Sequence, residues 1–164
     1  MADSSVPNLA SRTTASETDL LYITDSAVDY KITIANLRAS LLANLPMRFR
    51  VDGQGFVLTT GVKGPVLTAT FAGTITGWYI HGNASGSIVF DIWKKSFATG
   101  SIPTVTNTIT ASAKPTLSSA FAAMSTTLTG WTTTFAVGDQ FLINVDSVST
   151  LTQAELVLLV TKTG

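Results

Sequence analysis

Between Gly73 and Gly164 the chain alternates apolar and polar side chains in short stretches that are rich in threonine. Turn-forming residues separate these stretches, for example Gly82-Asn83 and Gly138-Asp139. β-Branched and aromatic side chains at every second position suit a pleated surface that is buried on one face. Several such stretches with turns between them predict an antiparallel β-sandwich. The strongest stretches are Thr74–His81, Ser87–Lys94, Phe141–Asp146 and Ala154–Thr161.

The spacing of these stretches predicts a mainly β fold, a jelly-roll-like sandwich of about eight strands over residues 66–164. A five-residue hairpin loop is expected at Gly82–Gly86. A bulge or close backbone approach is expected at Gly77, since glycine inside a strand marks such positions. Residues 97–127, which are poor in charge, are expected to form a long crossover with short strand pieces and one helical turn at Ala120–Met124.

A separate small unit is predicted within residues 1–46. Two alternating stretches, Asp19–Thr24 and Val28–Ile32, flank a turn and predict a β-hairpin. Thr33 is expected to cap a helix that runs from Ile34 to about Ala43 with its apolar side chains on one face. A hairpin and three helical turns are too small to close a core, which needs roughly 40 residues.

We therefore expect this unit to dock on identical copies or on a larger particle, the simpler alternative being that it packs on its own sandwich. Residues 47–65 are expected to connect it to the sandwich. The side chains expected to make the attachment are the apolar ones of the hairpin and helix: Leu20, Leu21, Tyr22, Ile23, Tyr30, Ile32, Ile34, Leu37 and Leu41.

The charge content favours association and argues against several ligand classes. Only 12% of the residues are charged and the net charge is zero, so little electrostatic repulsion keeps copies apart. The basic residues are scattered, which argues against nucleic acid as a partner. The absence of cysteine excludes disulfides and thiolate metal sites. No cofactor or metal is expected.

The chain shows no targeting segment at its N-terminal end. It lacks a basic stretch followed by an apolar one, so no signal peptide is expected. The longest apolar run, Leu156–Val160, is far shorter than the roughly 20 residues that span a bilayer, so no membrane insertion is expected.

Catalytic motifs are weak. His81 is the single histidine, and a Ser-His-Asp arrangement can be drawn with Ser85 or Ser87 and Asp91. However, no segment of the sequence resembles a nucleophile elbow, and few acidic residues are placed to form the paired carboxylates that sugar hydrolysis requires. We expect no enzyme activity, with a small depolymerase as the alternative.

The aromatic residues are stronger candidates for binding. Tryptophan usually belongs to a core or a subunit interface, and this is the favoured interpretation for Trp78, Trp93 and Trp131. Trp93 is expected to be the most accessible of the three, because Asp91 and Lys94 lie beside it. If a saccharide is bound, the expected contacts around the 82–86 loop are Tyr79, His81, Asn83 and Trp93.

Two parts of the chain resemble segments of tailed-bacteriophage structural proteins. Asp19–Ile23, Asp29–Thr33 and Ala35–Leu37 resemble the N-terminal attachment segment of many phage fibre and appendage proteins. From Thr60 onward the chain is similar to a β-sandwich domain that recurs in such proteins. The matching stretches are Gly73–Trp78, Gly86–Lys94, Ser112–Ser118, Leu128–Thr132 and Phe141–Ser147.

This resemblance implies a virion protein, a homotrimeric short fibre or decoration protein that is made in the host cytoplasm. Its N-terminal part would bind another virion protein of the capsid, neck or tail, and its sandwich would be displayed, for adhesion to a host-surface saccharide. The alternative is an architectural protein that clamps neighbouring subunits. The resemblance assigns no catalytic residue. Tyr79-Ile80-His81 departs from the more aliphatic or acidic pattern of such domains, so their ligands do not carry over directly.

Overall fold

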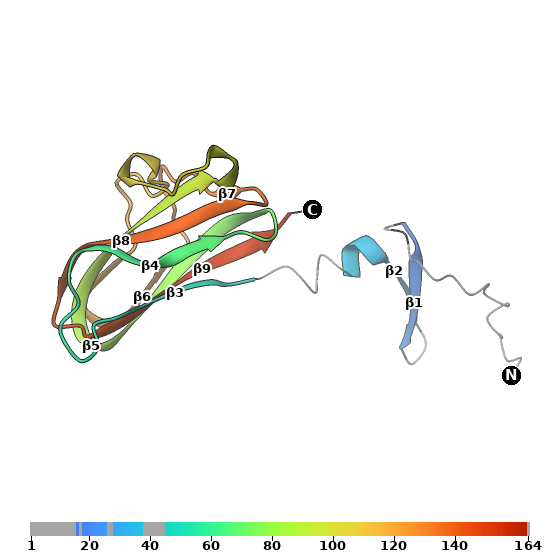
Figure 1. Ribbon diagram of the computed structural model, residues 1–164. Helices are drawn as coiled ribbons and strands as arrows, with labels where there is room; N and C mark the ends of the chain where they lie inside the picture. Colours follow the sequence, from blue (N-terminus) through green and yellow to red (C-terminus); the bar gives the residue numbers. More distant parts are fainter. Residues whose placement is uncertain (1–15, 17, 26–27, 38–44, 164) are drawn as a thin grey trace, which may run out of the picture. The chain divides into compact units, whose positions relative to one another are not determined.

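The N-terminal hairpin pairs two alternating stretches, β1 (Leu20–Asp25) and β2 (Val28–Thr33), in antiparallel register (Figure 1). The computed structural model describes residues 16, 18–25, 28–37 and 45–163. The chain divides into two compact units, Met1–Leu41 and Leu42–Gly164. The predicted hairpin is confirmed, while its predicted turn at residues 26–27 lies outside the described residues.

Thr33 caps the helix that follows the hairpin, as the sequence predicts. Residues 34–37 are helical, and the backbone N–H of Asn36 donates to Thr33 Oγ1 over 3.1 Å. The N–H of Ile34 donates to the carbonyl of Asp19 over 2.9 Å, which ties the helix start to the strand β1. The remainder of the predicted helix, residues 38–43, lies outside the described residues.

The larger unit is one antiparallel sheet that is folded over into two layers and nearly closed (Figure 1). The strand order is β3-β9-β5-β8-β4, and β6 and β7 also pair with β5. The predicted antiparallel β-sandwich is confirmed, with seven strands in place of about eight. The strands are β3 (Met47–Asp52), β4 (Gly61–Thr68), β5 (Gly73–Ser96), β6 (Thr116–Ser125), β7 (Thr134–Phe135), β8 (Asp139–Ser149) and β9 (Gln153–Lys162).

One strand, β5, belongs to both layers. Its first part, Gly73–Gly82, pairs with β9, and its second part, Ser87–Ser96, pairs with β8. The hairpin loop expected at Gly82–Gly86 is therefore wrong, because the strand bends there and continues. Glycine allows this bend: a Cβ on Gly86 would lie 2.5 Å from Thr150 Oγ1 and 2.7 Å from Leu151 Cδ2. The bulge expected at Gly77 is confirmed by a register shift between Ile75 and Gly77.

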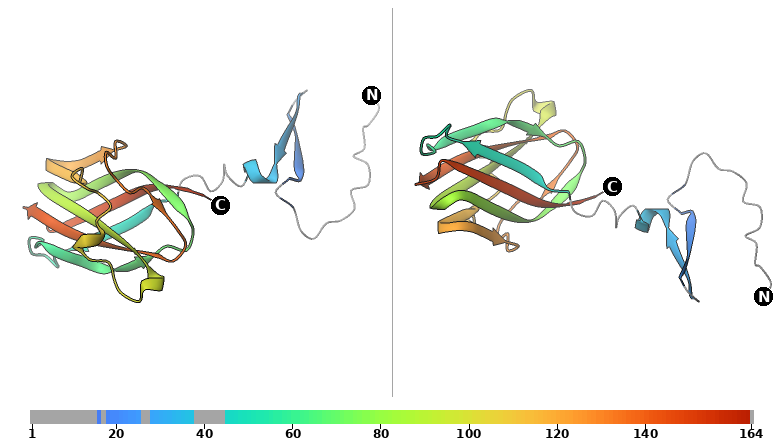
Figure 2. Two further views of the ribbon diagram at one scale, coloured as in Figure 1. Left: turned by 90° about the horizontal axis from the view of Figure 1, so that it is seen from above. Right: turned by 90° about the horizontal axis from the view of Figure 1, so that it is seen from below.

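The last strand of the chain, β9, lies between β3 and β5 (Figure 2, right). Met47 is opposite Leu158 and Asp52 is opposite Gln153, so the two ends of the sandwich sequence pair along their full length. Residues 47–65, expected to be a connector, instead supply β3 and more than half of β4. Their apolar side chains Met47, Phe49 and Val51 are buried, which explains why the segment joins the sheet.

The segment between β5 and β6 contains two short 3₁₀ helices, η1 (Phe97–Thr99) and η2 (Val105–Asn107), and then runs beside β5, where Thr108 bridges to Trp93 and the N–H of Ile109 donates to the carbonyl of Ile92. The helical turn expected at Ala120–Met124 is wrong, since these residues belong to β6. Alanine favours helices in isolation, but here the open edge of β5 offers a complete row of backbone partners, from Trp78–Ser125 to His81–Ala122.

The core follows the predicted alternation. Phe135 packs edge-to-face against both Phe71 and Phe141, and Trp78 is 7% exposed within the same cluster. The largest fully buried side chains come from four strands and one turn: Phe90, Phe141, Ile75, Ile80, Ile88, Ile92, Leu117, Ile143, Leu151, Leu156, Leu158 and Val145.

Candidate functional site

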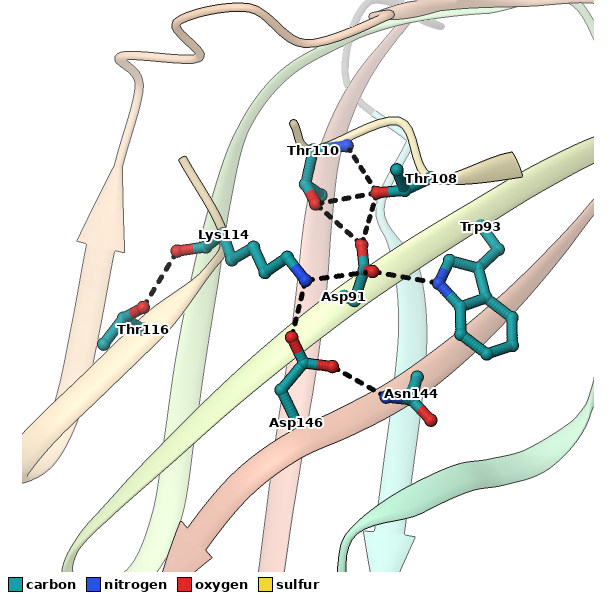
Figure 3. A network of polar contacts seen from close by, with 8 residues as sticks. All are labelled: Asp91, Trp93, Thr108, Thr110, Lys114, Thr116, Asn144 and Asp146. Atoms are coloured by element: carbon teal, nitrogen blue, oxygen red, sulfur yellow. Dashed lines mark hydrogen bonds and ion pairs between the residues drawn. The ribbon is translucent and has the colours of Figure 1, made fainter. Parts of the chain in front are cut away.

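The most buried charged group of the sandwich is the carboxylate of Asp91 on β5 (Figure 3). Its neighbours Phe90 and Ile92 point into the core and are fully buried. Alternation therefore directs Asp91 and Trp93 to the opposite face of the strand. The crossover between β5 and β6 lies over this face and leaves Asp91 only 1% exposed.

Four donors surround the Asp91 carboxylate. Oδ1 accepts from Thr108 Oγ1 over 2.6 Å and from Thr110 Oγ1 over 2.8 Å. Oδ2 accepts from Trp93 Nε1 over 3.0 Å and from Lys114 Nζ over 3.1 Å. Burial by itself raises the pKa of Asp91, but the bonds from Thr108, Trp93, Thr110 and Lys114 together outweigh it and lower that pKa below its usual value.

Lys114 links Asp91 to a second carboxylate. Its Nζ lies 2.6 Å from Asp146 Oδ2, and Asn144 Nδ2 donates to the other oxygen of Asp146 over 2.7 Å. The bond to Asp146 is the main cause that raises the pKa of Lys114, with a further contribution from Asp91 against the opposing effect of burial. We call Asp91, Trp93, Thr108, Thr110, Lys114 and Asp146 the Asp91 network.

The Asp91 network is built to hold charge in place. A lysine nucleophile needs a lowered pKa, and a carboxylate base needs a free lone pair facing substrate. Lys114 has a raised pKa, and each Asp91 oxygen already accepts two hydrogen bonds. The network therefore fastens the crossover to β5 and β8 and does not offer a reactive group.

This arrangement corrects the expectation for Trp93. Trp93 is 7% exposed and its indole N–H is bound to Asp91, so it is not accessible for stacking on a sugar. The charged neighbours that suggested exposure are themselves held: Asp91 by the network and Lys94 by Asp139, at 3.3 Å. Trp131 is partly buried against the core, and its Nε1 donates to the carbonyl of Ala113 over 2.8 Å.

The Ser-His-Asp arrangement that can be drawn from the sequence is not assembled. The hydroxyl of Ser85 donates to the carbonyl of Ser119, and that of Ser87 accepts from the N–H of Ser119. Asp91 is occupied within its network. His81 instead stacks on Tyr79, with ring centroids 6.5 Å apart and ring planes 14° apart.

Tyr79 and His81 belong to a second polar site, on the outer surface of the β3-β9-β5 layer. Cross-strand pairing sets Tyr79 beside Val157 and then Arg48, and it sets His81 beside Glu155 and then Arg50. We call these six residues the outer face. Arg48 Nη1 forms an ion pair of 3.2 Å with Glu155.

Two open hollows adjoin on this outer face. One of about 350 Å³ is lined by Arg48, Tyr79 and Val157, and the other of about 260 Å³ by Arg50 and Asn83, with His81 and Glu155 shared by both.

Asn83, the third predicted saccharide contact on this strand, has a structural role. Its Oδ1 accepts from the backbone N–H groups of Thr152 and Gln153, over 3.2 and 3.0 Å. Its Nδ2 donates to Thr152 Oγ1 over 2.7 Å. Asn83 therefore secures the turn between β8 and β9. Of the four predicted saccharide contacts, Tyr79 and His81 are the two that the structure leaves available.

The predicted attachment residues are described in part. Leu20 is 49% exposed and Leu21 41% exposed, while Ile32, Ile34 and Leu37 are partly buried. Leu21 lies opposite Ile32 in the hairpin, so these two side chains share one face. Leu41 and the side chains of Tyr22, Ile23 and Tyr30 lie outside the described residues.

Within the described ranges, no three histidine or acidic side chains gather in a way that suits a metal ion. No helix there has the length and apolar character needed to cross a membrane. Comparison with protein-family models, with curated proteins and with solved structures gives no match.

Proposed function

We propose that this chain is a structural protein of a tailed-bacteriophage particle, a short fibre or decoration protein whose N-terminal hairpin attaches to the particle while the sandwich is displayed. The sequence resemblance of both parts to phage proteins supports this proposal. The antiparallel sandwich is a fold suited to displaying a contact surface. The mechanism is binding without turnover.

The observation that carries the proposal is the division of the chain into a sandwich and a very small N-terminal unit. That unit contains a two-stranded sheet, which is marginal in water without further packing. Leu20 and Leu21 start its first strand and are about half exposed. Exposed leucines on a marginal hairpin are suited to an attachment surface that is completed by another protein.

Several identical copies are part of the proposal, and β6 is the surface that best supports self-association. Among residues 45–163, β6 pairs only with β5, which leaves its other edge open. Phe121 is 64% exposed and Met124 is 56% exposed. Residues 115–138 contain no charged side chain, so the usual protection of an open edge by charge is missing. Copies arranged as a homotrimer would also multiply weak display contacts into avidity.

A purely architectural role is the second candidate, and the uncharged edge of β6 is the observation that favours it. In that case the sandwich would clamp neighbouring subunits and bind nothing on the host. Binding of saccharide to the isolated full-length protein separates the two roles.

The attachment is tested by a double substitution in the full chain, Leu20→Asp with Leu21→Asp. Both side chains are exposed, so the folded sandwich should be unaffected while the apolar attachment surface is lost. Val62→Asp is the matched control, because Val62 is also 50% exposed but lies on β4. We expect the control protein to copurify with phage particles and the double variant to remain free, as measured by mass spectrometry of purified particles. Equal incorporation of both would refute the attachment role.

A further inference from the structure

We infer that the outer face binds an acidic saccharide, with one sugar ring against Tyr79 and His81 and a carboxylate on Arg48 and Arg50. This inference rests on the proposed display role of the sandwich and names the class of ligand that the displayed sandwich binds. The two hollows adjoin at His81 and Glu155, and we call them together the depression along β5 and β9.

The aromatic side of the depression suits a sugar ring. Tyr79 and His81 are two positions apart on β5, which places both rings on the same face. Their planes differ by 14°, so one ligand meets both rings in nearly the same orientation. Val157 lies beside Tyr79 and is only 6% exposed, so its aliphatic side chain lines the floor of the hollow. Aromatic faces of this kind bind the C–H face of a pyranose through dispersion and hydrophobic contact.

The opposite side of the depression is basic. Arg48 and Arg50 are also two positions apart, on β3, and their side chains are directed to the same face. The Arg48 side chain is 59% exposed, and its two hydrogen bonds to Glu155 both come from Nη1. In the described part of the chain Arg50 forms no ion pair. Guanidinium groups with free donors bind carboxylates in a bidentate manner.

Glu155 lies between the aromatic and basic rows and selects the kind of anion. In the strand register, Glu155 of β9 lies opposite Arg50 of β3 on one side and opposite His81 of β5 on the other. Its carboxylate would repel a polyphosphate, whereas it can accept hydrogen bonds from sugar hydroxyls. A nucleic acid also requires a longer basic stripe than two arginines provide.

Lys63 increases the positive charge nearby. A third hollow, between β3 and β4, is lined by Arg48, Arg50 and Lys63 and contains no acidic residue in its lining. Asp52, the next residue of this face along β3, is outside the hollows and accepts a hydrogen bond from Gln153. Within the depression itself, Arg48 and Arg50 against Glu155 give a positive excess in a protein of zero net charge. The combination of rings, one carboxylate and excess guanidinium points to uronic or sialic acid glycans.

The test uses the full-length protein on an array of uronate- and sialate-containing oligosaccharides printed beside their methyl esters. Each ester keeps the sugar ring and removes the charge. We expect binding to acidic glycans and at least tenfold weaker binding to the matching esters. Titration calorimetry with the best glycan should then show at least a tenfold loss for Tyr79→Ala and for Arg50→Gln.

Two further variants keep the test specific. Tyr79→Phe retains the ring and should bind as the original protein does. Lys162→Gln removes a cation at the end of β9, away from both hollows, and should have no effect. Thermal unfolding confirms that each variant is folded.

Absence of binding to every acidic glycan, or binding that survives both Tyr79→Ala and Arg50→Gln, would overturn the inference. Neither result affects the attachment test, which is scored on particle incorporation, so the two proposals fail separately.

Discussion

Trp93 donates its indole hydrogen bond to Asp91, two residues earlier on the same strand, over 3.0 Å. The two side chains lie on the outward face of β5, yet both are buried, because the crossover between β5 and β6 covers them. Side chains on the outward face of a strand normally face solvent, but Asp91 and Trp93 form a second buried region, which is polar. The sandwich is thus stabilised by an apolar core on one side of β5 and by a charged network on the other.

Replacement of Asp91 should be among the most destabilising surface-side changes in the sandwich. Asp91→Ala leaves the hydroxyls of Thr108 and Thr110, the indole N–H of Trp93 and part of the Lys114 charge without their acceptor. We expect a loss of about 3 kcal/mol in the free energy of unfolding, measured by urea denaturation. Asp146→Ala is the comparison, because Asp146 is more exposed and Lys114 retains Asp91; a loss of about 1 kcal/mol is expected there. Similar losses for the two variants would contradict the proposal that Asp91 contributes more than Asp146 to the free energy of unfolding.

Stability should fall in acid through Asp91. Its pKa is lower in the folded protein than in the unfolded chain, so the unfolded chain binds more protons in this range. The contribution is therefore complete above the unfolded value, about 4, and is lost as the pH falls through the folded value. Urea midpoints between pH 2 and 7 should decrease toward acid, and Asp91→Asn should flatten this decrease. A profile that is unchanged in Asp91→Asn would exclude Asp91 as the group responsible.

The contribution of Lys114 to stability has the opposite pH dependence. Its pKa is raised by Asp146 and Asp91, so its contribution is present below the unfolded value, about 10.4, and is lost only as the pH rises through the folded value. Lys114→Met should lower stability at pH 7 and reduce the loss of stability seen above pH 10. Lys162→Met, at the end of β9, serves as the control for the loss of one lysine outside the Asp91 network. An alkaline limb of equal steepness in Lys114→Met would argue against this linkage.

The bend in β5 should depend on the absence of a side chain at Gly86. A methyl group there would meet Thr150 and Leu151, so Gly86→Ala should cost about 1–3 kcal/mol. Leu151→Ala removes a fully buried side chain and should cost about 2–5 kcal/mol alone. In the double variant the new methyl group still meets Thr150 but no longer meets the Leu151 side chain, so the combined loss should be smaller than the sum by at least about 0.5 kcal/mol. Strict additivity would show that the two positions do not share this contact.

Self-association through β6 should be sensitive to a single charge. Phe121→Lys places a like charge on every copy at the open edge and should lower the association constant at least tenfold, measured by sedimentation velocity. Val137→Lys is the control, because Val137 is equally exposed, at 67% against 64%, but lies outside β6. If both variants associate as the original protein does, another surface forms the oligomer.

The elements that could be predicted are those determined by neighbours in sequence. The strands β1, β2, β8 and β9 and the cap at Thr33 follow from local signals, and the structure confirms them. The 82–86 segment was misleading because Gly82 and Gly86 look like turn residues. Their function depends on Thr150 and Leu151, which are more than sixty residues away.

The candidate site was predictable only on the strand that carries its aromatic residues. Tyr79 and His81 follow each other in the alternation of β5, so their common face is visible in sequence. Arg48 and Glu155 are in contact although 107 residues separate them in sequence, and no local sequence pattern predicts that contact. The Arg48-Phe49-Arg50 alternation was the available signal, since it marks a strand with one charged face. The accessibility expected for Trp93 is wrong for the same reason, since the residues that cover Trp93 belong to the crossover and are distant in sequence.

The position of β9 determines when this protein can fold. The first strand of the sandwich, β3, pairs along its length with β9, which is the last strand in the described part of the chain. During synthesis β3 therefore lacks its partner, with Phe49 and Val51 unpaired, until β9 has left the ribosome. Pairing at such sequence distance makes folding slow relative to helical proteins of similar size. Loss of Gln153–Lys162 would thus leave β3 without its paired strand and the first part of β5 without β9.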